Sequence, residues 1–188
     1  MKWENKIFQN HTNSSFESVA LKIFQYQAIN NNVYKTYLKL LNVNPNNVKN
    51  LSQIPFLPIE FFKHQDVVCK SKNIDIVFTS SGTSGKQSKH IVNDLSIYMK
   101  SFTSGFEHFY GNIMDYTILA LLPSYMERSG SSLIYMCEKL IKYSEKKESG
   151  FYLNEHQELS NLLLELERQN RKTLLIGVSF ALLDFVEK

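Results

Sequence analysis

The residues whose types could do chemistry are concentrated in residues 77–90, which read VFTSSGTSGKQSKH. An apolar run ends there in a loop rich in glycines, hydroxyl groups and lysines, and a helical pattern begins after Asn93 and Asp94. Glycines let the backbone approach an anion, hydroxyl and N–H groups donate to its oxygens, and lysine adds positive charge. A strand, such a loop and a helix form a common cradle for phosphate groups. The candidate phosphate-contacting residues are Thr79, Ser80, Ser81, Gly82, Thr83, Ser84, Gly85, Lys86, Ser88 and Lys89.

Two familiar nucleotide-binding loops do not fit this stretch. Relative to Gly85-Lys86, a Walker A loop needs its first glycine at Ser80 and a hydroxyl residue at Gln87. The dinucleotide-binding pattern needs a third glycine beyond Gly82 and Gly85. The sequence therefore predicts a phosphate-binding loop of another type.

The core of the loop, residues 80–85, resembles the signature of adenylate-forming acyl ligases, T-S-G-T-T-G-x-P-K. In this chain Ser84 replaces a threonine, no proline follows Gly85, and the lysine comes one place late, at Lys89. The spacing leaves open whether Lys86 or Lys89 contacts phosphate.

The stretch is more similar to the acyl-protein synthetases of bacterial bioluminescence, the long-chain-fatty-acid–luciferin-component ligases. Ser88, Ile91 and Asp94 follow the loop at the places where that group has a serine, an apolar residue and an early helical aspartate. Two further strings carry the resemblance: residues 54–63, IPFLPIEFFK, and residues 121–132, LLPSYMERSGSS. For the first string we expect a structural role, as a proline-constrained connector.

The second string follows an apolar run, residues 116–122, that is typical of a buried parallel strand. Ligands of α/β proteins bind beyond the carboxyl ends of such strands. Arg128 either meets a phosphate or carboxylate there or pairs with an acid at the surface. Gly177, at a later strand-to-helix turn, either shapes an acyl pocket or only permits the turn. The candidate substrate-binding residues are Pro123, Ser124, Tyr125, Arg128, Gly130 and Gly177.

The resemblance implies an ATP-dependent acyl-activating ligase. Such an enzyme joins a fatty or other carboxylate to the α-phosphate of ATP, releases pyrophosphate with the help of Mg²⁺, and passes the acyl group to a thiol of a protein or of CoA. The catalytic residues are not identifiable, because Cys69 and Cys137 lie in no motif.

Two other classes of function stay open. A serine-dependent acyltransferase or hydrolase would use Ser84 with His90 as the base, although the chain lacks a G-x-S-x-G elbow. A non-catalytic domain that keeps the ligase shape and binds a partner is the other class.

Composition excludes several classes of partner. The net charge is +3, and the basic residues in 146–147 and 168–172 are expected on the solvated surface, so no nucleic acid is predicted. The first six residues lack the apolar core of a signal peptide, no apolar run has the length of a membrane span, and the two cysteines are expected to be buried free thiols, so we expect a cytoplasmic protein. The five histidines show no ligand spacing and predict no metal. The sequence gives no information on the oligomeric state.

The predicted fold class is α/β. Two helices precede residue 65, and strands and helices then alternate, with strands at 67–69, 74–78, 116–122 and 173–176, which predicts a mostly parallel sheet. We expect residues 1–64 to form a helical segment packed on the sheet and residues 65–188 to form part of an adenylation subdomain. Because no helix stop precedes Lys188, the resemblance implies the N-terminal portion of a ligase, with its C-terminal part absent and no complete reaction by this chain alone.

Overall fold

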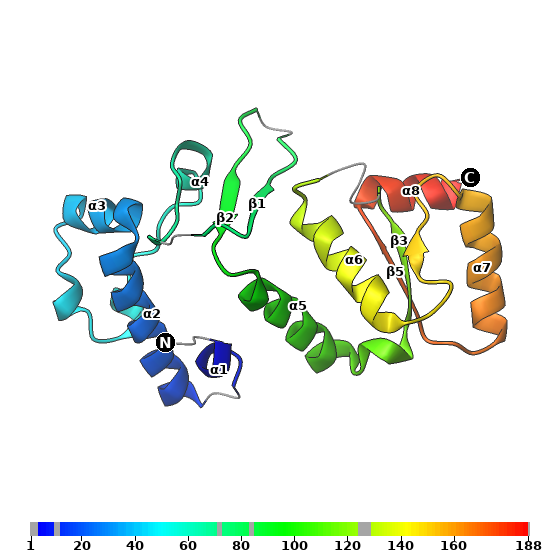
Figure 1. Ribbon diagram of the computed structural model, residues 1–188, viewed down its shortest axis with the longest axis horizontal. Helices are drawn as coiled ribbons and strands as arrows, with labels where there is room; N and C mark the ends of the chain where they lie inside the picture. Colours follow the sequence, from blue (N-terminus) through cyan, green and yellow to red (C-terminus); the bar gives the residue numbers. More distant parts are fainter. Residues whose placement is uncertain (1–3, 10–11, 71–72, 83–84, 124–128, 188) are drawn as a thin grey trace. The chain divides into compact units, whose positions relative to one another are not determined.

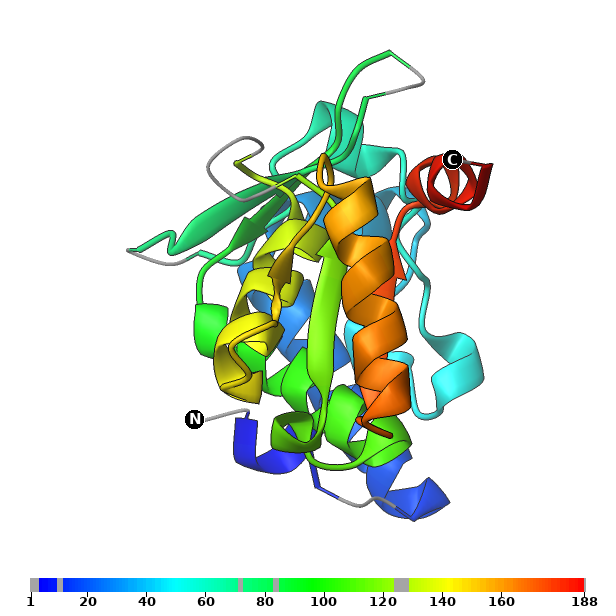
Figure 2. The ribbon, with the colours of Figure 1, turned by 90° about the vertical axis from the view of Figure 1, so that its right-hand side faces the viewer.

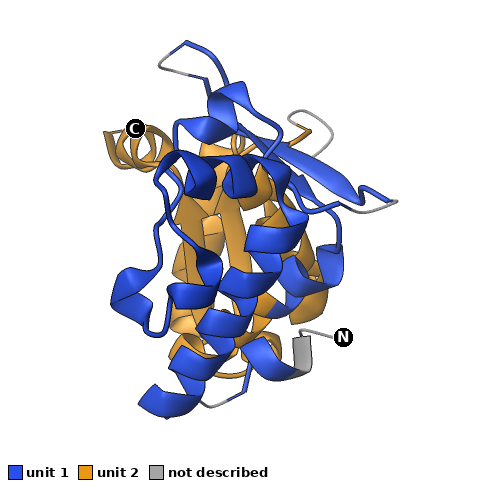
Figure 3. Cartoon of the chain, turned by 90° about the vertical axis from the view of Figure 1, so that its left-hand side faces the viewer, with its two compact units in different colours: residues 1–100 blue, residues 101–188 orange. Residues whose placement is uncertain are grey.

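The computed structural model describes residues 4–9, 12–70, 73–82, 85–123 and 129–187. The chain forms two compact units, residues 1–100 and residues 101–188, which Figure 3 colours separately. Each unit is described by itself below. The division expected at residues 64 and 65, and the packing of the N-terminal helices on the sheet, stay predictions.

The first half of unit 1 is helical, as the sequence predicts (Figure 1). Its core consists of Phe24, Ala28, Tyr34, Leu38 and Val48. The elements are α1 (Glu4–Ile7), α2 (Asn13–Asn30), α3 (Asn32–Leu40), the 3₁₀ turns η1 (Pro45–Asn47) and η2 (Leu51–Gln53), and α4 (Phe61–His64).

The start of α2 differs from the capping box that Ser14 and Glu17 predict. Thr12 is the N-cap, and its hydroxyl accepts a hydrogen bond from the Ser15 amide. The Glu17 carboxylate accepts instead from the Leu51 amide at 3.0 Å. Glu17 therefore makes a tertiary hydrogen bond with Leu51 and not the capping contact that the local sequence pattern predicts.

The proline-rich string is attached to α3 by two tyrosines. Tyr34 donates to the carbonyl of Pro55, and Tyr37 donates to the carbonyl of Phe56 at 3.3 Å. Burial raises the pKa of Tyr34 to about 12, so its phenol stays a donor. These contacts agree with the structural role expected for this string.

The loop of residues 80–88 joins two antiparallel strands, β1 (Ile76–Thr79) and β2 (Lys89–Val92). The expectation of a strand, loop and helix is wrong at this point, because β2 comes between the loop and α5 (Leu95–Tyr110). The β-branched residues Ile91 and Val92 pair with β1, and an antiparallel neighbour needs only a loop as its connection. The strand expected at residues 67–69 is reduced to a single bridge between Cys69 and Asn31.

Unit 2 contains the parallel sheet that the sequence predicts. Its strand order is β4–β3–β5, and both pairings are parallel. After α5 come η3 (Ile113–Asp115), β3 (Thr117–Leu121), α6 (Ser132–Ser144), β4 (Gly150–Phe151), α7 (His156–Arg168), β5 (Thr173–Gly177) and α8 (Ser179–Glu187). The α/β fold class is confirmed.

Strand β3 is the centre of unit 2 and is buried along its whole length. Ile118 and Ala120 pack in clusters with residues of α6, and Leu119 and Leu121 pack with residues of α7. Because successive strand residues point to opposite faces, the two helices cover the two faces of the sheet, as Figure 2 shows.

The aromatic face of α5 is only partly core. Phe106 is 7% exposed and packs with Ile113, Ile118 and Leu140, whereas Phe109 is 78% exposed. Helical spacing places Phe106 and Phe109 on one apolar face and predicts that both belong to the core; this prediction is confirmed for Phe106 and wrong for Phe109.

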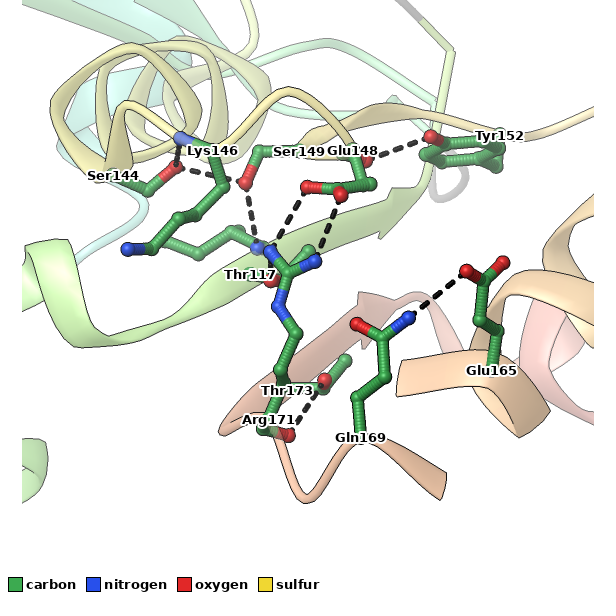
Figure 4. Close-up of polar contacts among 11 residues, drawn as sticks. Thr117, Ser144, Lys146, Glu148, Ser149, Tyr152, Glu165, Gln169, Arg171 and Thr173 are labelled. Atoms are coloured by element: carbon green, nitrogen blue, oxygen red, sulfur yellow. Dashed lines mark hydrogen bonds and ion pairs between the residues drawn. The ribbon is translucent and has the colours of Figure 1, made fainter. Parts of the chain in front are cut away.

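A polar cluster lies at the amino ends of β3 and β5 (Figure 4). The guanidinium of Arg171 donates two hydrogen bonds to Glu148, at 2.7 and 2.9 Å, and one to the Thr117 hydroxyl at 3.0 Å. The expectation that the basic stretch 168–172 is only solvated surface is therefore wrong for Arg171. We call Arg171, Glu148 and Thr117 the amino-edge clamp.

Candidate functional site

The neck of the predicted phosphate loop is closed by two serines. The Ser80 amide donates to the Ser88 carbonyl at 3.1 Å, and the Ser88 amide donates to the Ser80 hydroxyl at 3.0 Å. Farther out, the Gly85 amide donates to the Gly82 carbonyl at 3.0 Å. The fold thus gives Ser80 and Ser88 a role in shaping the loop, and each hydroxyl still has a proton that it can donate.

Gly82 and Gly85 both have backbone angles that disfavour other residues, with φ of +72° and +104°. A Cβ at Gly82 would stand 2.8 Å from Cγ of Gln87, so the side chain of Gln87 covers this glycine. At Gly85, none of the described residues places an atom within 4 Å of an added Cβ. The loop is therefore tightly packed at Gly82 and open at Gly85.

The charged and polar ends of the loop face solvent. Ser81, Lys86 and Lys89 are exposed, and Lys89 lies opposite Thr79 in the strand register. Two further candidate residues, Thr83 and Ser84, lie outside the described residues. Exposed lysines beside an open glycine turn can attract and hold an anion.

His90, the base of the hydrolase alternative, contacts an aromatic ring. It lies in β2, where its ring stacks on Phe62 of α4 with centroids 5.8 Å apart and an interplanar angle of 12°. This contact holds the hairpin against the end of the proline-rich string. The observed role of His90 is thus structural, while the nucleophile of that alternative, Ser84, is not described.

Two aspartates connect the hairpin to α5. The carboxylate of Asp75 accepts from the Leu95 amide at 2.9 Å, and the Asp75 amide donates to the Val92 carbonyl at 2.9 Å. Asp94 accepts from the Ser96 amide at 3.0 Å. The start of α5 is therefore capped by side chains from both ends of the hairpin, which positions the loop relative to the helix.

The second candidate region is the carboxyl edge of the sheet in unit 2. In the strand order β4–β3–β5, the direction of the chain connections changes between β3 and β5. Ligands of open α/β sheets usually bind at the carboxyl ends of the two strands where this change occurs. Pro123 and Gly130 flank the exit from β3, and Gly130 has φ of +83°. The predicted residues Ser124, Tyr125 and Arg128 lie outside the described residues.

Gly177, at the end of β5, is required by packing. A Cβ there would stand 2.9 Å from Cγ of Leu182 and 3.2 Å from Cβ of Leu121. Of the two roles open for Gly177, this close approach supports the tight turn, because it lets α8 pack beside β3.

The same edge carries a pocket that the sequence did not indicate. It has a volume of about 460 Å³ and lies between the turn after β4 and helix α8. Its lining residues are Leu153, Asn154, His156, Gln157, Ala181 and Asp184. His156 and Asp184 come from different helices, so no local motif could have revealed them.

The cysteines are poor nucleophiles in this fold. Cys137 is fully buried, and burial raises the pKa of its thiol to about 11. Cys69 is half-buried and donates to the Gln27 side chain, and burial raises the pKa of its thiol as well. Because the thiolate is the reactive form, neither cysteine is activated for acyl transfer.

No described group of three or more His, Cys, Asp or Glu residues is arranged to hold a metal ion. No described helix has the length and apolar character needed to cross a membrane.

The fold and the loop define an α/β protein with a glycine- and hydroxyl-rich hairpin loop. Comparison with protein families gives a match to the family described as acyl-protein synthetase, LuxE, over residues 6–119. The match covers more than half of the 188 residues, so the chain belongs to this family, one of acyl-activating ligases. No curated protein and no solved structure matches the chain.

The matched residues include the whole of the loop and of the proline-rich string. They end within β3, so the carboxyl-edge pocket lies beyond them.

Proposed function

We propose that this protein contributes the phosphate-binding part of an ATP-dependent ligase of the adenylate-forming superfamily. The reaction joins a fatty or other carboxylate to the α-phosphate of ATP and passes the acyl group to a thiol. The observation that carries the proposal is the hairpin loop of residues 80–88, which is open at Gly85, contains the exposed Lys86 and is followed directly by the exposed Lys89. Family membership supports acyl activation in general.

The task of the loop in this proposal is electrostatic. The carboxylate attacks the α-phosphorus, and the bond to the bridging oxygen of pyrophosphate breaks, so negative charge grows on the leaving group. Loop amides, the hydroxyls of Ser81 and Ser88, and a lysine stabilise that charge together with Mg²⁺. The neck between Ser80 and Ser88 keeps these donors in place before the substrate arrives.

Calorimetric titration with Mg·ATP tests the proposal, with the product of the complete natural open reading frame. The combined change Gly82→Ala and Lys89→Ala removes a lysine and forces a Cβ against Gln87. We expect the affinity for ATP to fall at least about tenfold, the loss of one good charged contact.

Two matched variants serve as controls. Lys22→Ala removes an equal charge from the exposed side of α2, and Gly111→Ala places a similar strain at φ of +88° outside the loop. Both should bind ATP like the wild type. Unchanged ATP affinity in the loop variant would contradict the proposal.

Pyrophosphate exchange by the same protein distinguishes a ligase from a ligase-shaped binding module. Exchange that depends on a carboxylate supports the ligase, and its absence with every carboxylate tested supports the module. Labelling by a serine-reactive fluorophosphonate would support the hydrolase instead.

A further inference from the structure

The proline-rich string of unit 1 is apolar on both of its sides. Its inner side chains, Ile54 and Leu57, pack against the core of this unit. Its outer side chains, Phe56 and Ile59, are 81% and 79% exposed. The structural role of the string accounts for the inner pair only, because the outer pair adds no contact to the core.

The exposed apolar surface continues onto α3. Tyr37 donates to the carbonyl of Phe56, and its ring meets that of Phe61 with centroids 5.7 Å apart. Leu40 follows Tyr37 by three residues, so it lies on the same side of the helix, and it is 76% exposed. We call Leu40, Phe56 and Ile59 the outer apolar patch. Large apolar groups gathered on one surface mark an interaction site, whereas single ones are ordinary.

The backbone under the patch is held in one conformation. Pro55 and Pro58 fix their own φ angles, and Tyr34 donates to the carbonyl of Pro55. The amide of Phe62 donates to the carbonyl of Ile59 at 3.1 Å. A surface that is already ordered loses little conformational entropy when it binds.

The charge around the patch is positive. Residues 31–64 contain four lysines and a single acidic residue, Glu60, which pairs with Lys63 at 3.3 Å. Lys39 is exposed and directly precedes the patch residue of α3. Unit 1 as a whole has twelve lysines against six acidic residues, which gives it a net charge of +6. The patch therefore suits a negatively charged partner.

We infer that the outer apolar patch docks on an anionic lipid surface. Phe56 and Ile59 insert among the acyl chains, and the lysines lie at the headgroups. Side chains as exposed as these stand out from the protein, which suits insertion into a soft layer. A second copy of the chain is a poorer occupant, because two positive units would repel each other. The inference goes beyond the proposed function and does not depend on it.

Co-sedimentation of the 188-residue chain with vesicles tests the inference. We expect stronger binding to vesicles of equal parts phosphatidylcholine and phosphatidylglycerol than to phosphatidylcholine alone, and weaker binding in high salt. The combined change Phe56→Ser and Ile59→Ser should lower the partition coefficient at least about tenfold, because it removes the inserted apolar groups. The midpoint of urea denaturation should stay close to that of wild type, since both side chains are exposed.

Two matched controls separate the patch from general stickiness. Phe109→Ser removes a phenylalanine of unit 2 that is 78% exposed, and its partition coefficient should stay within about twofold of wild type. Lys39→Ala should weaken binding to the anionic vesicles about fivefold, the effect of one basic residue near such a surface. Lys147→Ala removes an equal charge from an exposed position in unit 2 and should have no effect.

Several outcomes would overturn the inference. One is a wild-type chain that does not sediment with the anionic vesicles. Another is an equal loss of binding in Phe109→Ser and in the patch variant. A third is self-association in sedimentation velocity that the patch variant abolishes, without vesicle binding, because the patch would then be an interface between copies of the chain.

Discussion

The two edges of the sheet in unit 2 each bring a basic side chain near a carboxylate, with different results. At the amino edge, Arg171 donates two short hydrogen bonds to Glu148, and its guanidinium donates a third to the Thr117 hydroxyl. At the carboxyl edge, His156 and Asp184 stand 4.0 Å apart beside a pocket of about 460 Å³. The first pair is joined by hydrogen bonds within the protein, and the second pair is separated and lines a pocket.

This difference shows that a neighbouring basic and acidic side chain form a fixed ion pair or stay apart according to the geometry of the elements that carry them. A bidentate ion pair that also donates to the Thr117 hydroxyl cannot take part in a reaction without losing contacts that stabilise the fold around it. A separated pair makes a smaller contribution to the stability of the protein, and both of its side chains line the pocket. Parallel sheets place their ligands at the carboxyl edge, so the division matches the general rule for α/β proteins.

The largest expected effect on stability comes from breaking the amino-edge clamp. Arg171→Met keeps the aliphatic stem but leaves the carboxylate of Glu148, two-thirds buried, without its partner. We expect the free energy of unfolding to fall by about 2 kcal/mol, the usual cost of losing hydrogen bonds to a charged group. Urea denaturation of the 188-residue chain measures this change.

The neighbouring Lys172 provides the matched control. Lys172→Met removes an ion pair with Asp115 at 3.3 Å, in which both side chains are about half exposed or more. Exposed pairs contribute less than about 1 kcal/mol, so this variant should be close to wild type. Equal losses in the two variants would show that the clamp is no stronger than a surface pair.

Acid should weaken the same clamp. The hydrogen bonds from Arg171 lower the pKa of Glu148 from 4.5 to about 2 in the folded protein. Folding therefore favours the ionised carboxylate, and its contribution is complete above pH 4.5 and is lost as the pH falls toward 2. The stability difference between wild type and Glu148→Gln should narrow steadily across that interval in urea titrations. A difference independent of pH would mean that the carboxylate is not stabilised by ionisation.

The smallest expected effect is at the carboxyl edge. The carboxylate of Asp184 is half exposed, and interactions of exposed charged groups contribute less than about 1 kcal/mol, so Asp184→Asn should lower the free energy of unfolding by less than Arg171→Met does. Thermal or urea unfolding of this variant beside Arg171→Met measures the contrast directly. A loss as large as that of the clamp variant would mean that this edge stabilises the fold as strongly as the amino edge does.

Much of the fold could be predicted because its signals are local. The apolar run at residues 116–122 predicts the buried strand β3, and the asparagine cluster before α3 supplies its cap at Asn31. The glycines of the loop indicate backbone angles that few other residues adopt, and both have positive φ. Patterns of this kind act within one turn or one strand, so a single sequence carries them.

Of the two candidate regions, the loop could be predicted from the sequence and the pocket could not. The loop is continuous in sequence, but the sequence pattern does not predict β2, which lies between the loop and the helix that begins after Asp94. A strand forms only when it pairs with another strand, and the short run of residues 89–92 does not indicate its partner. Its pairing with β1 could therefore not be predicted from the sequence.

The sequence by itself determined which segments are apolar, where the chain can turn, and which stretch has the residue types that can bind an anion. Only the tertiary structure decided that Arg171 meets Glu148, that His90 stacks on Phe62, and that His156 faces Asp184. The physical reason is distance. Backbone propensity and capping act between near neighbours, whereas the environment of a charged or titratable side chain is set by whichever elements pack around it.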